Sequence, residues 1–194
     1  MPSIEEPQQI HSVSVRNLVE FMLQEGDITP GSFQKPGRAQ AGTQGHKKVQ
    51  RSRPESYQSE VEVAFRVAEE ELPLEIRGRI DGVDASLEPV LIEEIKTTTL
   101  ALDLVHEDHN PLHWAQAKCY AYIFAQQENL SKIRIHLTYY QLDTETEKTF
   151  ERDFTLGELE VFFNDLITPY LTWFRKVRER HLQRDLTIGE LDFP

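Results

Sequence analysis

The chain has 194 residues, 39% of them apolar, a single cysteine and a formal net charge of −12. Its length is that of about one domain with a sizeable core. One cysteine excludes a disulfide framework, a zinc knuckle and an iron–sulfur cluster held by the chain's own thiolates. The acidic balance argues against a general nucleic-acid binder, because phosphate binding needs cations. There is no signal-peptide layout near Met1 and no apolar run of about 18 residues, so we expect no membrane span and a reducing, cytoplasmic setting.

The first half of the chain is expected to form two helices followed by three strands. Apolar residues at helical spacing predict a helix over 12–24, and two prolines and two glycines predict a loop over 28–37. The polar stretch 38–53 is expected to be helical. Apolar and polar residues then alternate with strand period, which predicts three successive strands separated by turns, at 57–68, 72–83 and 89–99.

The second half is expected to alternate helix and strand. A helix is predicted over 111–127, and a hairpin follows with strands over 132–142 and 149–154. Helical spacing returns from 155 to about 182, where Pro169 is expected to kink or split the helix. A strand–helix–strand crossover permits parallel pairing of the later strand with the earlier ones. The order of elements therefore predicts an α/β fold.

Positive charge is concentrated in one segment of this acidic chain. Residues 28–54 contain no acidic residue and six basic ones, so the segment carries +6 and the rest of the chain −18. A charge block is usually a solvated face, and the alternative is an anion-binding patch on an acidic body. The six cations are Lys35, Arg38, Lys47, Lys48, Arg51 and Arg53.

Two of the predicted strands carry charges that a core strand would exclude. Alternate side chains of a strand share a face, so a tight hairpin would place Asp81 near Glu94 and Lys96. Adjacent carboxylates repel unless a cation lies between them, and hard oxygen ligands suit Mg²⁺ or Mn²⁺. A neighbouring lysine can then position or activate a water for attack on a phosphate. The alternative is a cross-strand ion pair with no chemical role.

Four motifs, in this order, resemble those of the PD-(D/E)XK nuclease superfamily, and specifically its RecB-like branch, which includes CRISPR-associated exonucleases. They are a helix with a histidine, then Gly-x-x-Asp, (Asp/Glu)-x-Lys and Gln-x-x-x-Tyr, and they occupy 42–46, 78–81, 94–96 and 116–120. The resemblance spans about residues 12–142. It implies a restriction-endonuclease-like α/β core with a mixed central sheet flanked by helices, and it implies a metal-dependent nuclease.

The resemblance assigns a metal site to the matching residues. Lys96 would be the catalytic lysine, and Glu60 matches an acidic position that in some members touches a second metal through water. Without the resemblance, His46 would be interpreted as an ordinary exposed helix histidine. The ligands of a Mg²⁺ or Mn²⁺ ion would be His46, Asp81, Glu94 and the backbone carbonyl of Ile95.

The resemblance also assigns DNA contacts, since the Gln-x-x-x-Tyr helix face borders the site in the family. His113 lies on the same face and is a candidate to join it, whereas Trp114 is expected to stack on a base or to pack in the core. Without the motif, a polar residue beside a half-buried tyrosine would be the simpler interpretation. The expected DNA-binding residues are Gln116, Tyr120, Lys47, Lys48, Arg51 and Arg53.

The chain departs from some of these relatives because it lacks the four cysteines that hold an iron–sulfur cluster. We expect one nuclease domain over 1–194, with a core at about 12–153 and a C-terminal helical segment at 155–183. Residues 186–194 resemble the lead-in to the motor of DinG- or XPD-type helicases, so the domain is interpreted as the front of a longer helicase, with a free-standing nuclease as the alternative. No phosphate-binding loop of Gly-x-x-x-x-Gly-Lys type occurs in the chain.

The function expected from the sequence is hydrolysis of DNA, with single-stranded DNA favoured by the resemblance alone and a role in DNA repair or processing. One alternative is an inactive DNA-binding module of the same fold. The other is an acidic protein-interaction domain in which the motifs are accidental. The sequence does not distinguish exonuclease from endonuclease action, polarity, DNA from RNA, or one metal from two.

Overall fold

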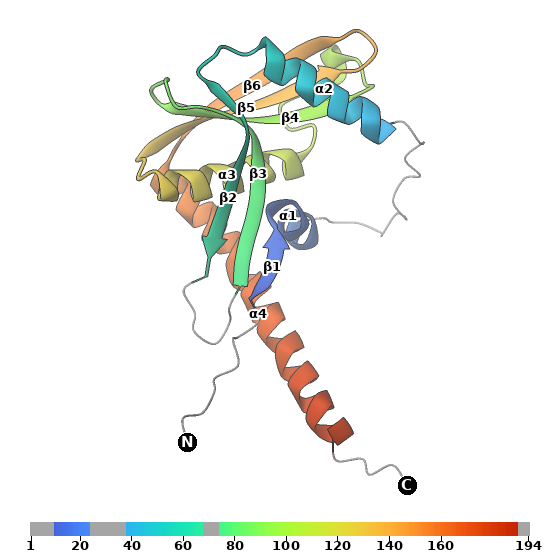
Figure 1. The fold of residues 1–194 in the computed structure, drawn as a ribbon, viewed down its shortest axis with the longest axis vertical. Helices are drawn as coiled ribbons and strands as arrows, with labels where there is room; N and C mark the ends of the chain where they lie inside the picture. Colours follow the sequence, from blue (N-terminus) through green and yellow to red (C-terminus); the bar gives the residue numbers. More distant parts are fainter. Residues whose placement is uncertain (1–9, 24–37, 68–73, 190–194) are drawn as a thin grey trace.

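The computed structural model describes residues 10–23, 38–67 and 74–189 (Figure 1). The predicted loop over 28–37 lies outside these residues. None of the described helices is long and apolar enough to cross a membrane. In chain order the elements are β1 (His11–Ser14), α1 (Val15–Leu23), α2 (Arg38–Ser52), β2 (Tyr57–Arg66), β3 (Leu74–Asp84), β4 (Val90–Thr98), a 3₁₀ turn (Leu102–Leu104), α3 (Pro111–Gln127), β5 (Lys132–Gln141), β6 (Thr146–Thr155) and α4 (Leu156–Gly189).

The six strands form one mixed sheet, with β1, β3, β4, β5 and β6 paired in that order and β2 paired to β3. Strands β2, β3 and β4 are consecutive antiparallel neighbours. Helix α3 then crosses over to β5, which pairs parallel to β4, and β6 returns antiparallel. This confirms the predicted α/β class, a mixed sheet flanked by helices, and the parallel crossover.

Strand β1 was not predicted, and the first helix begins later than residue 12. His11–Ser14 pair parallel with the first residues of β3, and the Ser14 hydroxyl then accepts the Asn17 N–H at 3.0 Å to cap α1. Four residues are too few to show a strand period, and the pairing depends on a partner strand about 60 residues away in the sequence.

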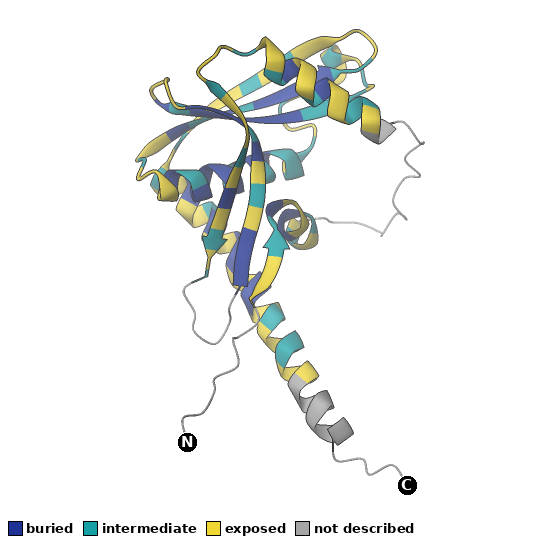
Figure 2. Cartoon of the chain, in the orientation of Figure 1, coloured by how far each residue is buried: buried dark blue, intermediate teal, exposed yellow. Residues whose placement is uncertain are grey.

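The two faces of the sheet are covered unequally (Figure 2). Helix α3 is largely buried and packs against α1, α4 and the sheet, where the main core lies. Helix α2 lies on the other face, where a small cluster of Val49, Ile95 and Tyr140 attaches it. Because neighbouring residues of β4 point to opposite faces, Ile92 joins the main core and Ile95 joins the α2 cluster.

Helix α4 continues through Pro169 without being split. A proline removes one backbone hydrogen bond and crowds the preceding turn. Here the neighbouring turns are held by the core, because Leu166, Ile167, Tyr170 and Leu171 are all buried. Packing of the apolar face therefore outweighs the local cost. Of the two predicted outcomes, a kink or a split, the split does not occur.

Strands β3 and β4 separate soon after their turn. They pair only from Gly82 opposite Glu93 to Asp84 opposite Leu91. Beyond that point β3 follows β2 and β1, whereas β4 stays with β5, so β2 and β3 bend away from β4, β5 and β6 (Figure 1). The backbone of β4 after Glu93 consequently has no strand partner on the β3 side, and polar side chains meet at this opening.

Candidate active site

Asp81 bridges the opening between β3 and β4. Its Oδ2 accepts the backbone N–H of Ile95 at 2.7 Å, which replaces the strand pairing that ends at Gly82. The hydrogen bond holds the carboxylate beside the Glu94–Lys96 segment. The sequence-based prediction that the hairpin brings Asp81 next to Glu94 and Lys96 therefore agrees with the geometry.

Helix α2 brings His46 to the same carboxylate. The Nδ1 atom of His46 lies 3.3 Å from Oδ1 of Asp81. The helix can approach the sheet closely because position 45 is a glycine. A Cβ there would lie 2.8 Å from Thr97, so any other residue would displace its neighbours. Burial lowers the pKa of His46, but the Asp81 and Glu94 carboxylates together outweigh it and leave that pKa above its usual value.

Glu94 is buried and only half satisfied. Its Oε1 pairs with the Lys96 ammonium at 2.6 Å, whereas its Oε2 is buried and has no hydrogen-bond partner among the described residues. Burial raises the pKa of Glu94 to about 7, opposed by Lys96 and reinforced by Asp81. A buried carboxylate oxygen without a partner is costly, and a cation would satisfy it.

The donor set suits a hard divalent ion that keeps part of its water. It offers the carboxylates of Asp81 and Glu94 and the imidazole of His46, which are ligands of Mg²⁺ and Mn²⁺. Within the described ranges, no three His, Cys, Asp or Glu side chains are already gathered as a metal site. His46, Asp81 and Glu94 would therefore have to draw together around an ion, with the backbone and water filling the remaining positions, as is usual for Mg²⁺.

Lys96 is held by two neighbours and linked to α3. Besides Glu94, its ammonium donates to Oε1 of Gln116 at 2.9 Å, and Nε2 of Gln116 lies 3.4 Å from the Tyr120 hydroxyl. The Tyr120 ring lies over the β3 backbone, since a Cβ at Gly78 would come within 2.3 Å of it. Thus the Gly-x-x-Asp, Glu-x-Lys and Gln-x-x-x-Tyr segments converge on one site.

The site opens into a groove of about 1140 Å³ that is lined by α1, α2, β2, β3 and α3. His46, Asp81 and Tyr120 form part of its wall. The groove also contains basic residues that were not predicted to lie near the site. Arg77 and Arg79 alternate with Asp81 on one face of β3, and this strand spacing could have predicted their place in the groove. The basic residues in the groove lining are Arg16, Lys47, Arg77 and Arg79.

The basic segment is divided between surface and interior. Lys47 lines the groove, and Arg51 is exposed, whereas Lys48 forms an exposed ion pair with Glu145. Arg53 is different, because its side chain is only 20% exposed and is bound to Glu93 and Glu147. The structure therefore does not present all four expected DNA-binding cations on one free face. Lys35 and the side chain of Arg38 lie outside the described part of the chain.

Glu60 and His113 differ in their relation to the site. Glu60 lines the groove and is bound by Gln50 at 2.9 Å and Arg79 at 2.6 Å. The Nδ1 atom of His113 lies 2.9 Å from the Tyr139 hydroxyl, and burial lowers the pKa of His113 to about 3. His113 is therefore a neutral, internally bonded side chain and not part of the groove wall.

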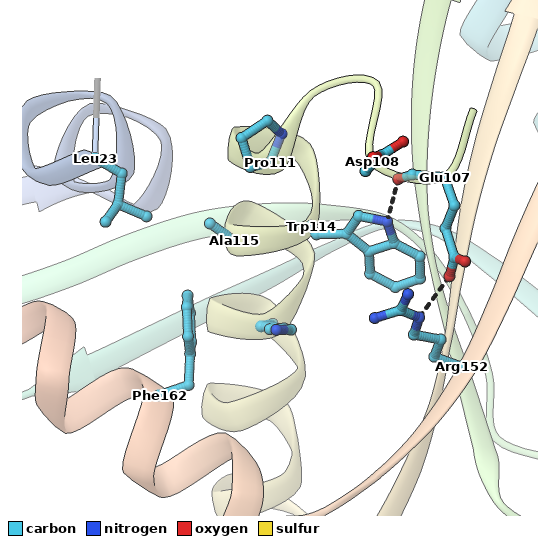
Figure 3. Close-up of a pocket in the computed structure, with 9 residues that line it drawn as sticks. Leu23, Glu107, Asp108, Pro111, Trp114, Ala115, Arg152 and Phe162 are labelled. Atoms are coloured by element: carbon cyan, nitrogen blue, oxygen red, sulfur yellow. Dashed lines mark hydrogen bonds and ion pairs between the residues drawn. The ribbon is translucent and has the colours of Figure 1, made fainter. Parts of the chain in front are cut away.

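Trp114 belongs to a separate pocket of about 550 Å³ on another side of α3 (Figure 3). Its Nε1 donates to the Glu107 carbonyl at 2.9 Å, and Arg152 lies over its ring while pairing with Glu107. Only 7% of Trp114 is exposed. The core interpretation of Trp114 therefore replaces base stacking in the active site.

Comparison with known proteins identifies a family. The sequence model of the PD-(D/E)XK nuclease superfamily matches residues 9–188. A search of curated protein sequences finds no match. Among solved structures, the chain is similar to the crystal structure of SSO0001, with 17% identity, a TM-score of 0.48, and coverage of 84% of this chain and 79% of that chain. That structural likeness is too distant to support a statement about function.

Proposed function

Since the chain belongs to the PD-(D/E)XK nuclease superfamily, we propose that it is a metal-dependent deoxyribonuclease that hydrolyses phosphodiester bonds at the opening between β3 and β4. The observation that carries the proposal is the buried Oε2 of Glu94, which has no partner among the described residues. Glu94 belongs to the same motif as Lys96, and its neighbours at the site include Asp81 and His46. In a purely structural buried pair, both carboxylate oxygens usually have hydrogen-bond partners.

The proposed roles follow from the contacts. Asp81, Glu94 and His46 would hold Mg²⁺ or Mn²⁺, with the carbonyl of Ile95 as a further ligand. When bound, the ion would supply Lewis-acid stabilisation of phosphate charge and lower the pKa of a bound water. Lys96, fixed by Glu94 and Gln116, would position the attacking water and stabilise charge on the phosphate.

The groove would hold the substrate strand, with phosphates contacted by Lys47 and Arg51 and with Gln116 and Tyr120 bordering the metal. Lys48 would contribute once DNA displaces its exposed partner Glu145, because exposed ion pairs are weak. Single-stranded DNA, and a role in DNA repair, are supported by the family resemblance. Glu60, which lines the groove, is the candidate for a second metal.

The covalent link to a helicase motor is also a proposal. It is supported by the resemblance of residues 186–194 to a helicase lead-in. In this organisation, residues 1–194 would act as one nuclease domain. A motor sequence that continues after Pro194 in the encoded protein would support this organisation. Nuclease activity does not depend on it.

A cleavage assay tests the proposed function. Labelled single-stranded DNA, duplex DNA and RNA would each be incubated with Mn²⁺, Mg²⁺ or EDTA, using wild type, Lys96→Ala and the surface control Lys132→Ala. We expect metal-dependent cleavage of single-stranded DNA by wild type and the control, and none by Lys96→Ala. Binding without cleavage would favour the inactive DNA-binding module. If the protein neither binds nor cleaves any of the three substrates, that result would favour the protein-interaction domain.

A further inference from the structure

Helix α2 carries a proposed metal ligand but has a small apolar attachment. Val49 is its one buried large apolar side chain among the residues whose side chains are described. The other buried position is Gly45, which packs against Thr97 and Tyr140. Apolar burial usually fixes a helix on a sheet. The placement of α2, and therefore of His46, must depend largely on polar contacts.

The strongest of these contacts is made by Arg53, directly after the last residue of α2. Its Nη2 donates to Oε1 of Glu93 at 2.6 Å and its Nε donates to Oε2 at 3.0 Å. The same carboxylate accepts the Tyr57 hydroxyl at 2.8 Å and the Thr138 hydroxyl at 2.5 Å. Glu93 is 1% exposed, so this forked pair is fixed inside the protein and tied to β2, β4 and β5.

Helical geometry connects this pair to the metal site. His46, Val49 and Gln50 are spaced i, i+3 and i+4, so they share one face of α2, and Arg53 follows directly after the helix ends at Ser52. Gln50 donates to the backbone carbonyl of Asp81 at 2.9 Å, and His46 lies beside the Asp81 carboxylate. A shift or rotation of α2 about its Arg53 end would therefore move His46 away from Asp81.

We propose that Arg53 and Glu93 are positioning residues that set the approach of His46 to Asp81 and thereby the affinity of the site for a divalent ion. The proposal rests on the proposed function, because it takes His46 as a metal ligand. It adds two residues that touch neither metal nor substrate, and it gives Arg53 a role other than DNA contact. Partners that orient metal ligands typically contribute a factor of 10 to 100 in metal affinity.

A double-mutant cycle tests the proposal by calorimetric titration of Mn²⁺ at one pH. Arg53→Gln is expected to lower Mn²⁺ affinity by about tenfold to a hundredfold, as His46→Ala does. The double variant should bind no more weakly than either single variant, because both changes remove the same ligand. Arg53→Lys, which keeps the charge but loses the fork, should restore part of the affinity.

The matched control is Arg134→Gln, which breaks another forked pair, with contacts of 2.7 and 3.2 Å to Asp153. That pair links β5 to β6 and does not touch α2, so Mn²⁺ affinity should stay at the wild-type value. If Arg53→Gln does not fold, the Arg53→Met/Glu93→Gln variant removes both charges from the interior and takes its place in the cycle.

Three results would overturn the proposal. Wild-type affinity in the Arg53 variant, together with a loss in His46→Ala, would show that Arg53 only stabilises the fold. Independent losses that multiply in the double variant would show that Arg53 acts on the site by a route other than the placement of His46. Absence of Mn²⁺ binding by wild type would instead overturn the metal site of the proposed function, and this inference with it.

Discussion

Glu93 and Glu94 are adjacent buried carboxylates that have opposite environments. Glu93 is 1% exposed and Glu94 is 3% exposed. On the α2 face, both Glu93 oxygens are bonded to Arg53, with two hydroxyls in addition. On the α3 face, Glu94 has Lys96 on one oxygen and nothing among the described residues on the other. Burial therefore does not separate the two carboxylates, whereas hydrogen-bond satisfaction does, and it supports a structural role for Glu93 and the proposed ligand role for Glu94.

The pKa values of the two groups show the same difference. Burial raises the pKa of Glu93, but Arg53, Thr138 and Tyr57 outweigh it and leave that pKa below its usual value. Burial raises the pKa of Glu94 to about 7, because Lys96 compensates only in part. Glu93 is thus stabilised as an anion by the fold itself. Glu94 would be stabilised as an anion by a bound cation, which is the property expected of a metal ligand.

The largest expected effect is on catalysis. Glu94→Gln should lower both Mn²⁺ affinity and cleavage, because it removes an anionic ligand. Lys96→Met should lower cleavage by at least about a hundredfold, because it removes the charge next to the phosphate, and should leave Mn²⁺ affinity nearly unchanged, because it removes no proposed metal ligand. Single-turnover cleavage and Mn²⁺ titration separate the two variants. Cleavage by Lys96→Met at the wild-type rate would contradict the proposed mechanism.

Stability should respond in the opposite way at the two glutamates. Glu93→Ala is expected to lower the free energy of unfolding by about 3 kcal/mol, near the lower end for a broken buried ion pair, because Arg53 is partly exposed and keeps Glu147. Glu94→Gln should raise it by about 1 kcal/mol at pH 7.5 in EDTA, because a poorly satisfied buried charge is removed. Urea denaturation measures both values. A larger loss for Glu94→Gln than for Glu93→Ala would reverse the assignment of the two residues.

The sequence predicted the parts of this comparison that depend on short-range pattern. Strand alternation placed Asp81 beside Glu94 and Lys96, and it places Glu93 on the other face. The partner of Glu93 could not be predicted, because Arg53 lies 40 residues earlier in the chain, just after α2, and was interpreted as part of a basic surface. The short strand β1 was missed for the same reason, and the sequence could not decide between a kink and a split at Pro169. Each depends on packing against residues that are distant in the sequence.

The stability of the metal-free protein should depend on pH through Glu94. Its folded-state pKa of about 7 exceeds the unfolded value of about 4.3. Between these values the unfolded chain has released a proton that the folded chain retains, so stability decreases as pH rises from about 4.3 to about 7. The contribution of Glu93 has the opposite sign. It is present above about pH 4.3 and is lost as pH falls below that value.

Urea denaturation in EDTA between pH 4.5 and 7.5 would measure this dependence. The stability of Glu94→Gln relative to wild type should rise across that range by on the order of 2 kcal/mol, from about 1 kcal/mol below wild type at pH 4.5 to about 1 kcal/mol above it at pH 7.5. The exposed control Glu55→Gln should follow the wild-type curve. A constant difference between Glu94→Gln and wild type would mean that Glu94 ionises normally in the folded protein, and the contrast with Glu93 would then be lost.

The cations in and just after α2 differ in the same way, because some are paired with carboxylates and others are not. Arg53 is bound to two carboxylates, whereas Lys47 and Arg51 form no ion pair with the residues that the structure describes. We therefore expect that replacing Lys47 and Arg51 by glutamine weakens binding of single-stranded DNA in EDTA. It should reduce the slope of log affinity against log salt by about 0.7 per lost contact.

Fluorescence anisotropy at several salt concentrations measures this slope, and unfolding by urea serves as the second measurement on the same proteins. The Lys47→Gln/Arg51→Gln variant should unfold at the wild-type urea concentration, since exposed cations contribute little to stability. Arg53→Gln should instead unfold at a lower urea concentration, because it leaves Glu93 buried without its main partner. Its salt slope should match that of wild type, since its guanidinium is already neutralised by Glu93 and Glu147. An unchanged slope in the Lys47/Arg51 variant would mean that these two residues are solvated and do not contact DNA. A reduced slope in Arg53→Gln would mean that Arg53 contacts DNA.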